Sequence, residues 1–223
     1  MQRIAIIGGT GKEGKGIAYR WAKAGHEVII GSRAVEKAQI AADEINRLLP
    51  STATKVVGMV NIQAADWADV IAVTVPYQAH AEMLTQLKEV IAGKLVIDVT
   101  VPLVPPKVHI VQMPPAGSAG NEARTILGEE TPIAIAFQNI SYERLMEEGD
   151  VDCDVLVCGS SKQAREQVLG LVNDAGLTGW DAGPLANAMV IEGLTSVLIH
   201  INKTYGSKEA GIKITGVQRD RSL

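Results

Sequence analysis

The sequence lacks an excess of positive charge. Its 21 lysines and arginines are outnumbered by 25 aspartates and glutamates, which leaves a formal net charge of −4 at pH 7. The basic residues are scattered among carboxylates, whereas binding to the phosphates of a nucleic acid requires them to be clustered. We therefore expect no nucleic-acid partner.

Long hydrophobic runs are also missing. No stretch reaches the roughly 18 to 20 apolar residues that span a bilayer, and the nearest run, Val190 to Ile201, carries Glu192 and His200. The apolar part of the opening segment runs straight into a glycine-rich turn, so it is much shorter than the apolar region of a signal peptide. These absences predict a cytoplasmic protein that does not interact with a membrane.

Cysteine is scarce. The sequence contains only Cys153 and Cys158, five positions apart along a predicted strand. Side chains at that spacing point to opposite faces of a strand, so we expect neither a disulfide nor a shared metal ion. Buried apolar packing is the expected role of both thiols.

The first hundred residues alternate short β-branched runs with longer amphipathic stretches. This pattern predicts a doubly wound parallel sheet with crossover helices, an α/β fold of the Rossmann type. The predicted strands are Arg3 to Ile7, Glu27 to Ile30, Lys55 to Met59, Val70 to Val75 and Lys94 to Val99. The predicted helices are Gly14 to Lys23, Val35 to Leu48 and Ala79 to Ile91, each with apolar residues at three- and four-residue spacing.

A proline-rich segment follows, from Val101 to Gly120, in which neither a helix nor a central strand is expected to persist. Regular patterning then resumes and predicts a small C-terminal α/β domain, with a boundary near residue 130 between residues 1–130 and 131–223. Its expected elements are strands at Ile133 to Ala136 and Asp154 to Cys158, and helices at Tyr142 to Met146, Ser161 to Asn173 and Pro184 to Asn202.

A glycine-rich turn joins the first strand to the first helix. Gly9-Thr10-Gly11-Lys12-Glu13-Gly14 is a G-x-G-x-x-G motif in the strand–turn–helix context that makes this pattern indicative of dinucleotide binding. Gly9 permits the tight turn, Gly11 lets the backbone approach a pyrophosphate, and Gly14 lets the helix pack closely on the sheet. The phosphates would face free amides at the helix N-terminus.

The end of the second strand predicts which dinucleotide binds. NAD-specific domains place a carboxylate about twenty residues beyond the turn, but here the sequence reads Gly31-Ser32-Arg33. Ser32 offers a hydroxyl and Arg33 a guanidinium suited to a phosphate dianion, and Lys37 lies one helical turn further on the same face. Glu36 is the one nearby carboxylate, but it falls inside the helix. The sequence therefore predicts NADP, with its 2′-phosphate at Ser32, Arg33 and Lys37.

No acid/base constellation stands out beside this NADP site. The histidines, at positions 26, 80, 109 and 200, are scattered, and Thr204, Tyr205 and Lys208 are spaced too closely for a Ser-Tyr-Lys arrangement. Hydride exchange between two cofactors requires only that their rings be stacked and aligned. We therefore predict no catalytic side chain and no metal.

Several motifs together resemble the coenzyme F420-dependent NADP oxidoreductases over essentially the whole chain. They are Gly-Gly-Thr-Gly at 8–11, Gly-Ser-Arg at 31–33, Val-Pro-Tyr at 75–77, Val-Cys-Gly at 157–159, Asp-Ala-Gly-Pro-Leu-Ala-Asn-Ala at 181–188 with the following Ile-Glu-Gly-Leu-Thr, and Gly-Ile-Lys at 211–213. The Gly-Pro-Leu-x-Asn-Ala signature is the most specific of them, because the glycine turn occurs in many unrelated enzymes.

The resemblance implies a reversible hydride transfer between the nicotinamide of NADP(H) and the deazaflavin F420, which would lie across the cleft between two domains. It implies NADP contacts at Thr10 to Glu13, Ser32, Arg33, Lys37, Val75 and Pro76, with Asp98 to Val101, including Thr100, bordering the nicotinamide. It also implies that Ala136 to Asn139, including Gln138, and the helix around Leu185 to Asn187 wall the deazaflavin.

Two other functions remain open on the sequence. One is an NADPH-dependent reductase of another small acceptor, such as a flavin or an imine. The other is a non-catalytic NADP sensor that reports redox state through a partner. The apolar final helix is either a homodimer face or packs on its own domain; its apolar residues are Val190, Ile191, Leu194, Val197, Leu198 and Ile201.

Overall fold

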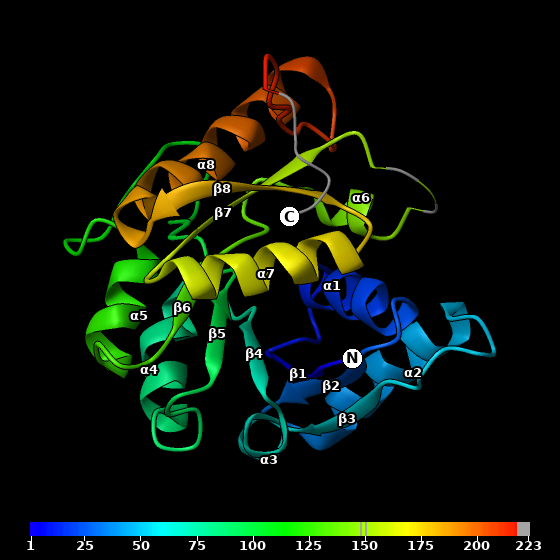
Figure 1. Ribbon diagram of the computed structural model, residues 1–223. Coiled ribbons are helices and arrows are strands. Elements are labelled where there is room, and N and C mark those ends of the chain that lie inside the picture. Colours follow the sequence, from blue (N-terminus) through cyan, green and yellow to red (C-terminus); the bar gives the residue numbers. More distant parts are fainter. Residues whose placement is uncertain (148, 150, 218–223) are drawn as a thin grey trace.

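An eight-stranded sheet runs through the chain in the order β3-β2-β1-β4-β5-β6-β7-β8 (Figure 1). The computed structural model describes residues 1–147, 149 and 151–217. The strands are β1 (Arg3–Ile7), β2 (Glu27–Ser32), β3 (Val57–Val60), β4 (Val70–Val73), β5 (Leu95–Asp98), β6 (Ile133–Ile135), β7 (Asp154–Gly159) and β8 (Thr178–Pro184). All neighbours pair in parallel except β6 with β7. The predicted α/β Rossmann fold is confirmed.

Helices cover both faces of this sheet. They are α1 (Lys12–Lys23), α2 (Val35–Leu48), α3 (Asn61–Trp67), α4 (Tyr77–Leu87), α5 (Ala119–Leu127), α6 (Tyr142–Leu145), α7 (Lys162–Asp174), the short 3₁₀ helix η1 (Leu185–Asn187) and α8 (Ala188–Tyr205). Apolar residues of α1, α2 and α7 share one core cluster, and those of α3, α4, α5 and α8 share the other. Strand β1 contributes residues to both clusters, with Ile4 and Ile6 on one side of the sheet and Ala5 and Ile7 on the other. This two-sided burial explains its continuous apolar sequence.

Several elements differ from the sequence-based prediction. Strand β3 lies at Val57–Val60 rather than at 55–59, and β4 ends at Val73, so Thr74 to Pro76 form a loop beyond the strand. Helices α3 and α5 and strand β8 were not predicted. Helix α3 has only seven residues, too few for a clear helical period. Helix α5 starts where a proline-rich segment was expected, because Ser118 caps it by accepting a hydrogen bond from the Asn121 amide at 2.9 Å.

The C-terminal helix also begins later than predicted. Pro184 is the last residue of β8, and η1 separates it from α8, which ends at Tyr205 and is capped by Gly206 in the left-handed conformation. Together, η1 and α8 (Leu185–Tyr205) form the one helical stretch in the described part of the chain that could cross a membrane by length and composition. The stretch contains no uninterrupted apolar run of that length. It carries a fully buried carboxylate, Glu192, which accepts hydrogen bonds from the amides of Ala119 and Gly120. These contacts join α8 to the N-terminus of α5.

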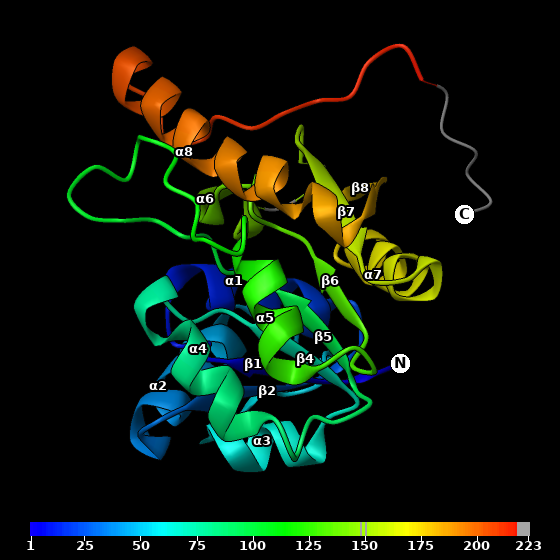
Figure 2. The same ribbon diagram turned by 90° about the vertical axis from the view of Figure 1, so that its left-hand side faces the viewer.

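The apolar residues of α8 divide between the core and the surface. Ile191 and Leu198 are buried, whereas Val190 is 69% exposed and Val197 45% exposed. The proline-rich segment lies along α8 (Figure 2), where the rings of His109 and His200 have centroids 6.1 Å apart. Part of the helix face is therefore covered by the chain itself.

The two cysteines lie on opposite sides of the sheet, as predicted. Cys153 belongs to the cluster beneath α1 and α7, and Cys158 to the cluster beneath α5 and α8. Both are free and buried, and burial raises the pKa of the Cys158 thiol to about 12.

The sheet is continuous through the predicted boundary near residue 130. Strand β6 pairs with β5 on one side and with β7 on the other, and the Trp21 ring of α1 meets Phe137 edge-on with centroids 5.7 Å apart. The direction of the strands reverses between β6 and β7, shortly after that boundary. The division into residues 1–130 and 131–223 stays a prediction.

Candidate functional site

The glycine turn lies between β1 and α1, at the carboxyl end of the parallel strands. A Cβ on Gly14 would lie 2.7 Å from Cα of Gly9, which shows how closely the helix packs on the turn. A Cβ on Gly11, the N-cap of α1, would meet nothing within 4 Å. The backbone at Gly11 is therefore open on the side that a pyrophosphate would approach, next to the first amides of α1.

Ser32, Arg33 and Lys37 lie together beyond the end of β2. Ser32 is buried, and its hydroxyl accepts a hydrogen bond from the Ala34 amide at 3.4 Å. Arg33 and Lys37 are exposed, and within the described chain neither side chain takes part in a hydrogen bond or ion pair. Two cations without anionic partners beside a buried hydroxyl suit a phosphate dianion.

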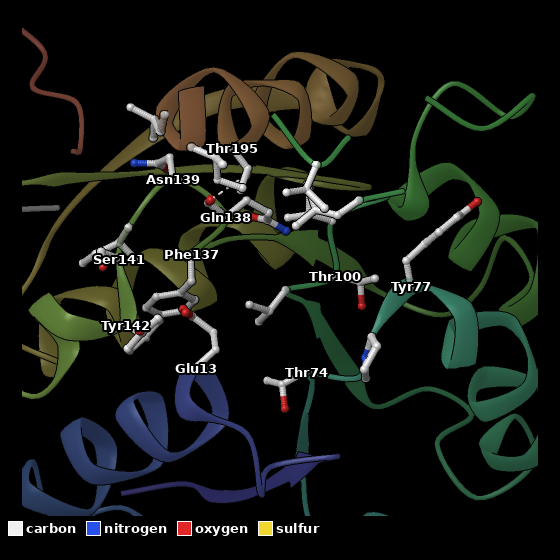
Figure 3. A pocket seen from close by; sticks show the side chains of 18 of the residues that line it. Glu13, Thr74, Tyr77, Thr100, Phe137, Gln138, Asn139, Ser141, Tyr142 and Thr195 are labelled. Carbon is white, nitrogen blue, oxygen red and sulfur yellow. Dashed lines mark hydrogen bonds between the residues drawn. The ribbon is translucent and has the colours of Figure 1, made fainter. Parts of the chain in front are cut away.

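A cleft of about 600 Å³ opens beside the glycine turn. It includes Glu13 from α1, Val75 and Pro76 after β4, Thr100 and Val101 after β5, and Gln138 after β6. The opposite wall is formed by α8, through Thr195, Leu198, Ile199 and Asn202. Figure 3 shows the labelled side chains from these segments arranged around the cleft. Ligands of open α/β sheets bind at this edge, outside the carboxyl ends of the strands.

Buried polar atoms without partners gather in this cleft. Glu13 Oε1, Thr100 Oγ1 and Gln138 Oε1 are shielded from solvent and have no hydrogen-bond partner among the described residues. All of these side chains line the cleft. Buried polar groups are normally hydrogen-bonded, so a ligand with its own donors and acceptors fits this site. A dinucleotide carrying a carboxamide and ribose hydroxyls meets that requirement.

A buried pair supports the strand end at Thr100. His80 Nε2 lies 2.7 Å from Asp98 Oδ2, and both side chains are fully buried. Burial lowers the pKa of His80, but the charge of Asp98 and the hydrogen bond to it outweigh burial, so the net shift is upward. Asp98 Oδ1 accepts a hydrogen bond from the Thr100 amide at 3.0 Å, and the Asp98 carbonyl accepts one from Gln138 Nε2 at 2.6 Å. Asp98 thereby links two segments of the cleft wall.

The segment after β6 is held in an unusual conformation. Phe137 has a φ of 76°, the only positive φ of a non-glycine residue in the described chain, and such strain often marks a functional site. The Thr195 hydroxyl of α8 donates a hydrogen bond to the Gln138 carbonyl at 2.7 Å, drawn as a dashed line in Figure 3. These contacts hold Phe137 and Gln138 against the cleft.

The predicted site residues divide into four groups. Six line the cleft: Glu13, Val75, Pro76, Thr100, Val101 and Gln138. The remaining turn residues (Gly9, Thr10, Gly11, Lys12 and Gly14) lie at the start of α1, and the phosphate residues lie beyond β2. Ala136 is fully buried, Leu185 packs in the core beside α5, and Asn187 is exposed and donates to the Ala182 carbonyl. The structure does not bring the last three to the cleft.

Some cleft residues were not predicted from the sequence. Thr74 follows β4 directly, so the tendency of ligands to bind at the carboxyl ends of parallel strands could have indicated it. Tyr142 and Thr195 lie on helices far along the chain and enter the cleft only through packing. Tyr142 accepts a hydrogen bond from Lys12 Nζ at 2.9 Å, which closes one side of the glycine turn. No local sequence pattern indicates such contacts.

The histidines and the Tyr205 to Lys208 segment are dispersed. His26 Nδ1 accepts from the Gln2 amide and Nε2 lies 3.0 Å from Asp174, outside the cleft. Tyr205 is 79% exposed, and of this group only Lys208 reaches the cleft lining. Within the described ranges, no three His, Cys, Asp or Glu side chains gather in a way that could hold a metal ion.

The fold and the glycine turn define a Rossmann-type protein with a candidate dinucleotide site at the strand ends. A family model described as "NADP oxidoreductase coenzyme F420-dependent" matches residues 3–102. The chain is 40% identical to the F420-dependent NADP reductase of Methanothermobacter marburgensis, over 96% of this chain and 99% of that protein. It is 37% identical to the F420-dependent NADP reductase of Methanocaldococcus jannaschii, over 97% and 99%. The chain belongs to the family of coenzyme F420-dependent NADP oxidoreductases.

A solved structure agrees with this assignment. The crystal structure of a candidate F420-dependent NADP reductase from Arthrobacter sp. FB24 superposes with a TM-score of 0.79 at 25% identity, over 96% of this chain and all of that one. The resemblance predicted from the motifs is confirmed.

Proposed function

We propose that this protein transfers a hydride reversibly between NADP(H) and the deazaflavin coenzyme F420. The observation that carries this proposal is the cleft at the strand ends, which has an open glycine turn at one side and three unpartnered buried polar atoms in its wall. Near full-length similarity to F420-dependent NADP reductases supports the choice of the two cofactors.

The pyrophosphate of NADP would bind at Gly9 to Gly14, where the first amides of α1 point out of the helix. The 2′-phosphate would bind Ser32, Arg33 and Lys37. The nicotinamide would then enter the cleft beside Val75, Pro76, Thr100 and Val101. The cofactors supply the hydride chemistry, and the chain supplies alignment and the exclusion of water.

The deazaflavin would lie on the side of the cleft formed by the segment after β6 and by α8. Gln138 is suitably placed, because its side chain lines the cleft. Ala136, Leu185 and Asn187, which the resemblance also implies as contacts, lie outside the lining and stay predictions. Their contribution would be to hold the backbone around the cleft.

We further propose that the protein is a cytoplasmic homodimer that binds no nucleic acid and no membrane. Val190 and Val197 on α8 are exposed, and so are Ile110 and Val111 of the adjoining proline-rich segment. A contact between two copies would bury this apolar surface. The scattered basic residues support the absence of a nucleic-acid partner. The fully buried carboxyl group of Glu192 in α8 supports the absence of a membrane contact.

A single assay separates this function from its alternatives. NADPH is mixed with purified F420, and the absorbance of the deazaflavin is followed. Bleaching of the deazaflavin at a rate proportional to enzyme supports the proposal. Turnover of NADPH with a flavin or an imine but not with F420 would identify a reductase of another acceptor, and tight NADPH binding without turnover of any acceptor would identify a sensor.

A further inference from the structure

Glu13 places a carboxyl group in the part of the cleft where the nicotinamide would bind. It lies in the first turn of α1, and its side chain lines the cleft together with Thr74, Val75 and Phe137. Figure 3 shows it extending from α1 toward Phe137. Its Oε1 is shielded from solvent and has no hydrogen-bond partner among the described residues. The pyrophosphate-binding role of the turn needs only backbone amides, so it does not account for this carboxyl group.

No charged group compensates for the burial of Glu13. Burial alone raises the pKa of its carboxyl group to about 8. Ionisable groups on α1 and at the cleft are engaged elsewhere: Lys12 donates to Tyr142, Lys15 pairs with Glu44 of α2, and Tyr77 donates to Glu122 of α5. Glu143 and Arg144 lie on α6, and Lys208 on the cleft rim. Glu13 therefore faces an apolar and uncharged part of the cleft.

We propose that Glu13 selects between the oxidised and reduced forms of the nicotinamide cofactor through its own protonation. The uncharged carboxyl group accommodates NADPH, and the ionised carboxylate favours NADP⁺. The two forms share their phosphates and ribose hydroxyls and differ in the positive charge of the oxidised nicotinamide ring. A carboxylate beside the nicotinamide attracts this positive charge, whereas a neutral carboxyl group does not.

The coupling works in both directions. If ionised Glu13 binds NADP⁺ more tightly, then NADP⁺ must lower the pKa of Glu13 relative to its value in the NADPH complex. Binding of NADP⁺ near pH 8 would therefore release a proton from Glu13 to solvent. As the pH rises through the pKa of Glu13, the affinity for NADP⁺ should rise relative to that for NADPH.

The inference rests on the proposed function, because it requires both nucleotides to bind in the cleft. Dissociation constants for NADP⁺ and NADPH are measured by calorimetry between about pH 6.5 and about pH 9.5. An opposite charge near a carboxyl group lowers its pKa by about one unit or more, so the ratio of the two constants should change by about tenfold over this range in favour of NADP⁺. Repeating the titrations in buffers of different ionisation enthalpy measures the released proton directly.

Glu13→Gln is the decisive variant, since it keeps the size and polarity of the side chain but cannot ionise. Its ratio of dissociation constants should be independent of pH and close to the low-pH value of the unsubstituted protein. Glu166→Gln, on the exposed face of α7, is the matched control and should retain the full pH dependence. Thermal melting shows whether both variants are folded.

A second measurement follows Glu13 itself. With ¹³C-labelled glutamate, the carboxyl resonance lost in Glu13→Gln should titrate at a lower pH in the NADP⁺ complex than in the NADPH complex. Equal titration in the two complexes, or an affinity ratio that changes with pH as strongly in Glu13→Gln as in the unsubstituted protein, overturns the inference. Failure of both nucleotides to bind instead contradicts the proposed function, so the two failures are distinguishable.

Discussion

His80 and Asp98 form a fully buried pair directly below the cleft, with Nε2 and Oδ2 2.7 Å apart. The other oxygen of Asp98 accepts a hydrogen bond from the Thr100 amide. His80 therefore holds the carboxylate that positions the strand end, although neither side chain lines the cleft. The pair gives the site a rigid support rather than a reactive group.

Asp98→Asn should reverse the direction of the His80 pKa shift. Burial lowers that pKa, and the charge of Asp98 is the main effect that opposes it. Without the charge, the pKa of His80 should fall below its ordinary value of 6.5, as measured by NMR titration of the imidazole ring. Removing one partner of a buried pair should also lower the free energy of unfolding by about 3 kcal/mol.

The sign of the pH dependence follows from the raised pKa of His80 in the folded protein. The stability that His80 contributes is fully present below its pKa in the unfolded chain, and it is lost as the pH rises through its pKa in the folded protein. The destabilisation by Asp98→Asn should therefore be larger at about pH 6 than at about pH 9. Asp174→Asn, at the half-exposed partner of His26, is the control and should have a much smaller effect. A pH-independent loss in Asp98→Asn would contradict the charge-based account.

Arg33→Ala should weaken NADP binding much more than NAD binding, because the guanidinium would contact only the 2′-phosphate. A charge-assisted hydrogen bond contributes about 1.5 to 3 kcal/mol, which corresponds to about ten- to a hundredfold in affinity. Calorimetric titration with both dinucleotides tests this. Arg47→Ala, which removes an exposed arginine in the last turn of α2, should change neither affinity. Equal losses for NADP and NAD in Arg33→Ala would place the 2′-phosphate elsewhere.

Gly11→Val should abolish binding of both dinucleotides without unfolding the protein. The added Cβ would have open space around it, since nothing beyond the neighbouring backbone lies within 4 Å of its position, but the side chain would occupy the space of the pyrophosphate. Calorimetry measures binding, and circular dichroism with thermal melting measures folding. Gly170→Val, another position with open space around the added Cβ, should bind normally. Retained binding in Gly11→Val would show that the turn does not hold the pyrophosphate.

No single substitution among His26, His80, His109, His200, Tyr205 and Lys208 should slow single-turnover hydride transfer by more than about tenfold. Positioned acids and bases contribute about 10² to 10⁴ in rate, and hydride transfer from carbon to carbon needs none of them. Stopped-flow absorbance of the bound cofactors measures the step. A thousandfold loss with unchanged cofactor affinities would mean that the substrate is protonated, which favours a carbonyl or imine acceptor.

The parallel sheet could be predicted from the sequence because its signals are local. Runs such as Ile4 to Ile7 are apolar at every position, as strands buried on both faces must be. The glycine motif likewise depends on neighbours in the chain, since Gly9, Gly11 and Gly14 act within one strand–turn–helix unit. The assignment of the 2′-phosphate to Ser32, Arg33 and Lys37 also rests on local sequence, at the end of the second strand, and stays a prediction.

The short and irregular elements could not be predicted in the same way. Strand β8 reads Thr-Gly-Trp-Asp-Ala-Gly-Pro, which has no alternating pattern and forms a strand because β7 offers it a partner. Helix α5 depends on Glu192, seventy-two residues away from Gly120, to accept its first amides. Such elements are stabilised by tertiary contacts that outweigh local propensity.

The sequence by itself therefore determined the fold class and the family, because the signals for both are short motifs, each made of residues that are neighbours along the chain. Only the tertiary structure decided the composition of the cleft, where Glu13, Thr100, Gln138 and Thr195 meet from four separate segments. It also decided that Glu13 Oε1 is shielded from solvent without a partner among the described residues, while the Asp98 carboxylate has several. The charge state of a carboxyl group depends on the groups around it in space, and this environment forms only when the chain folds.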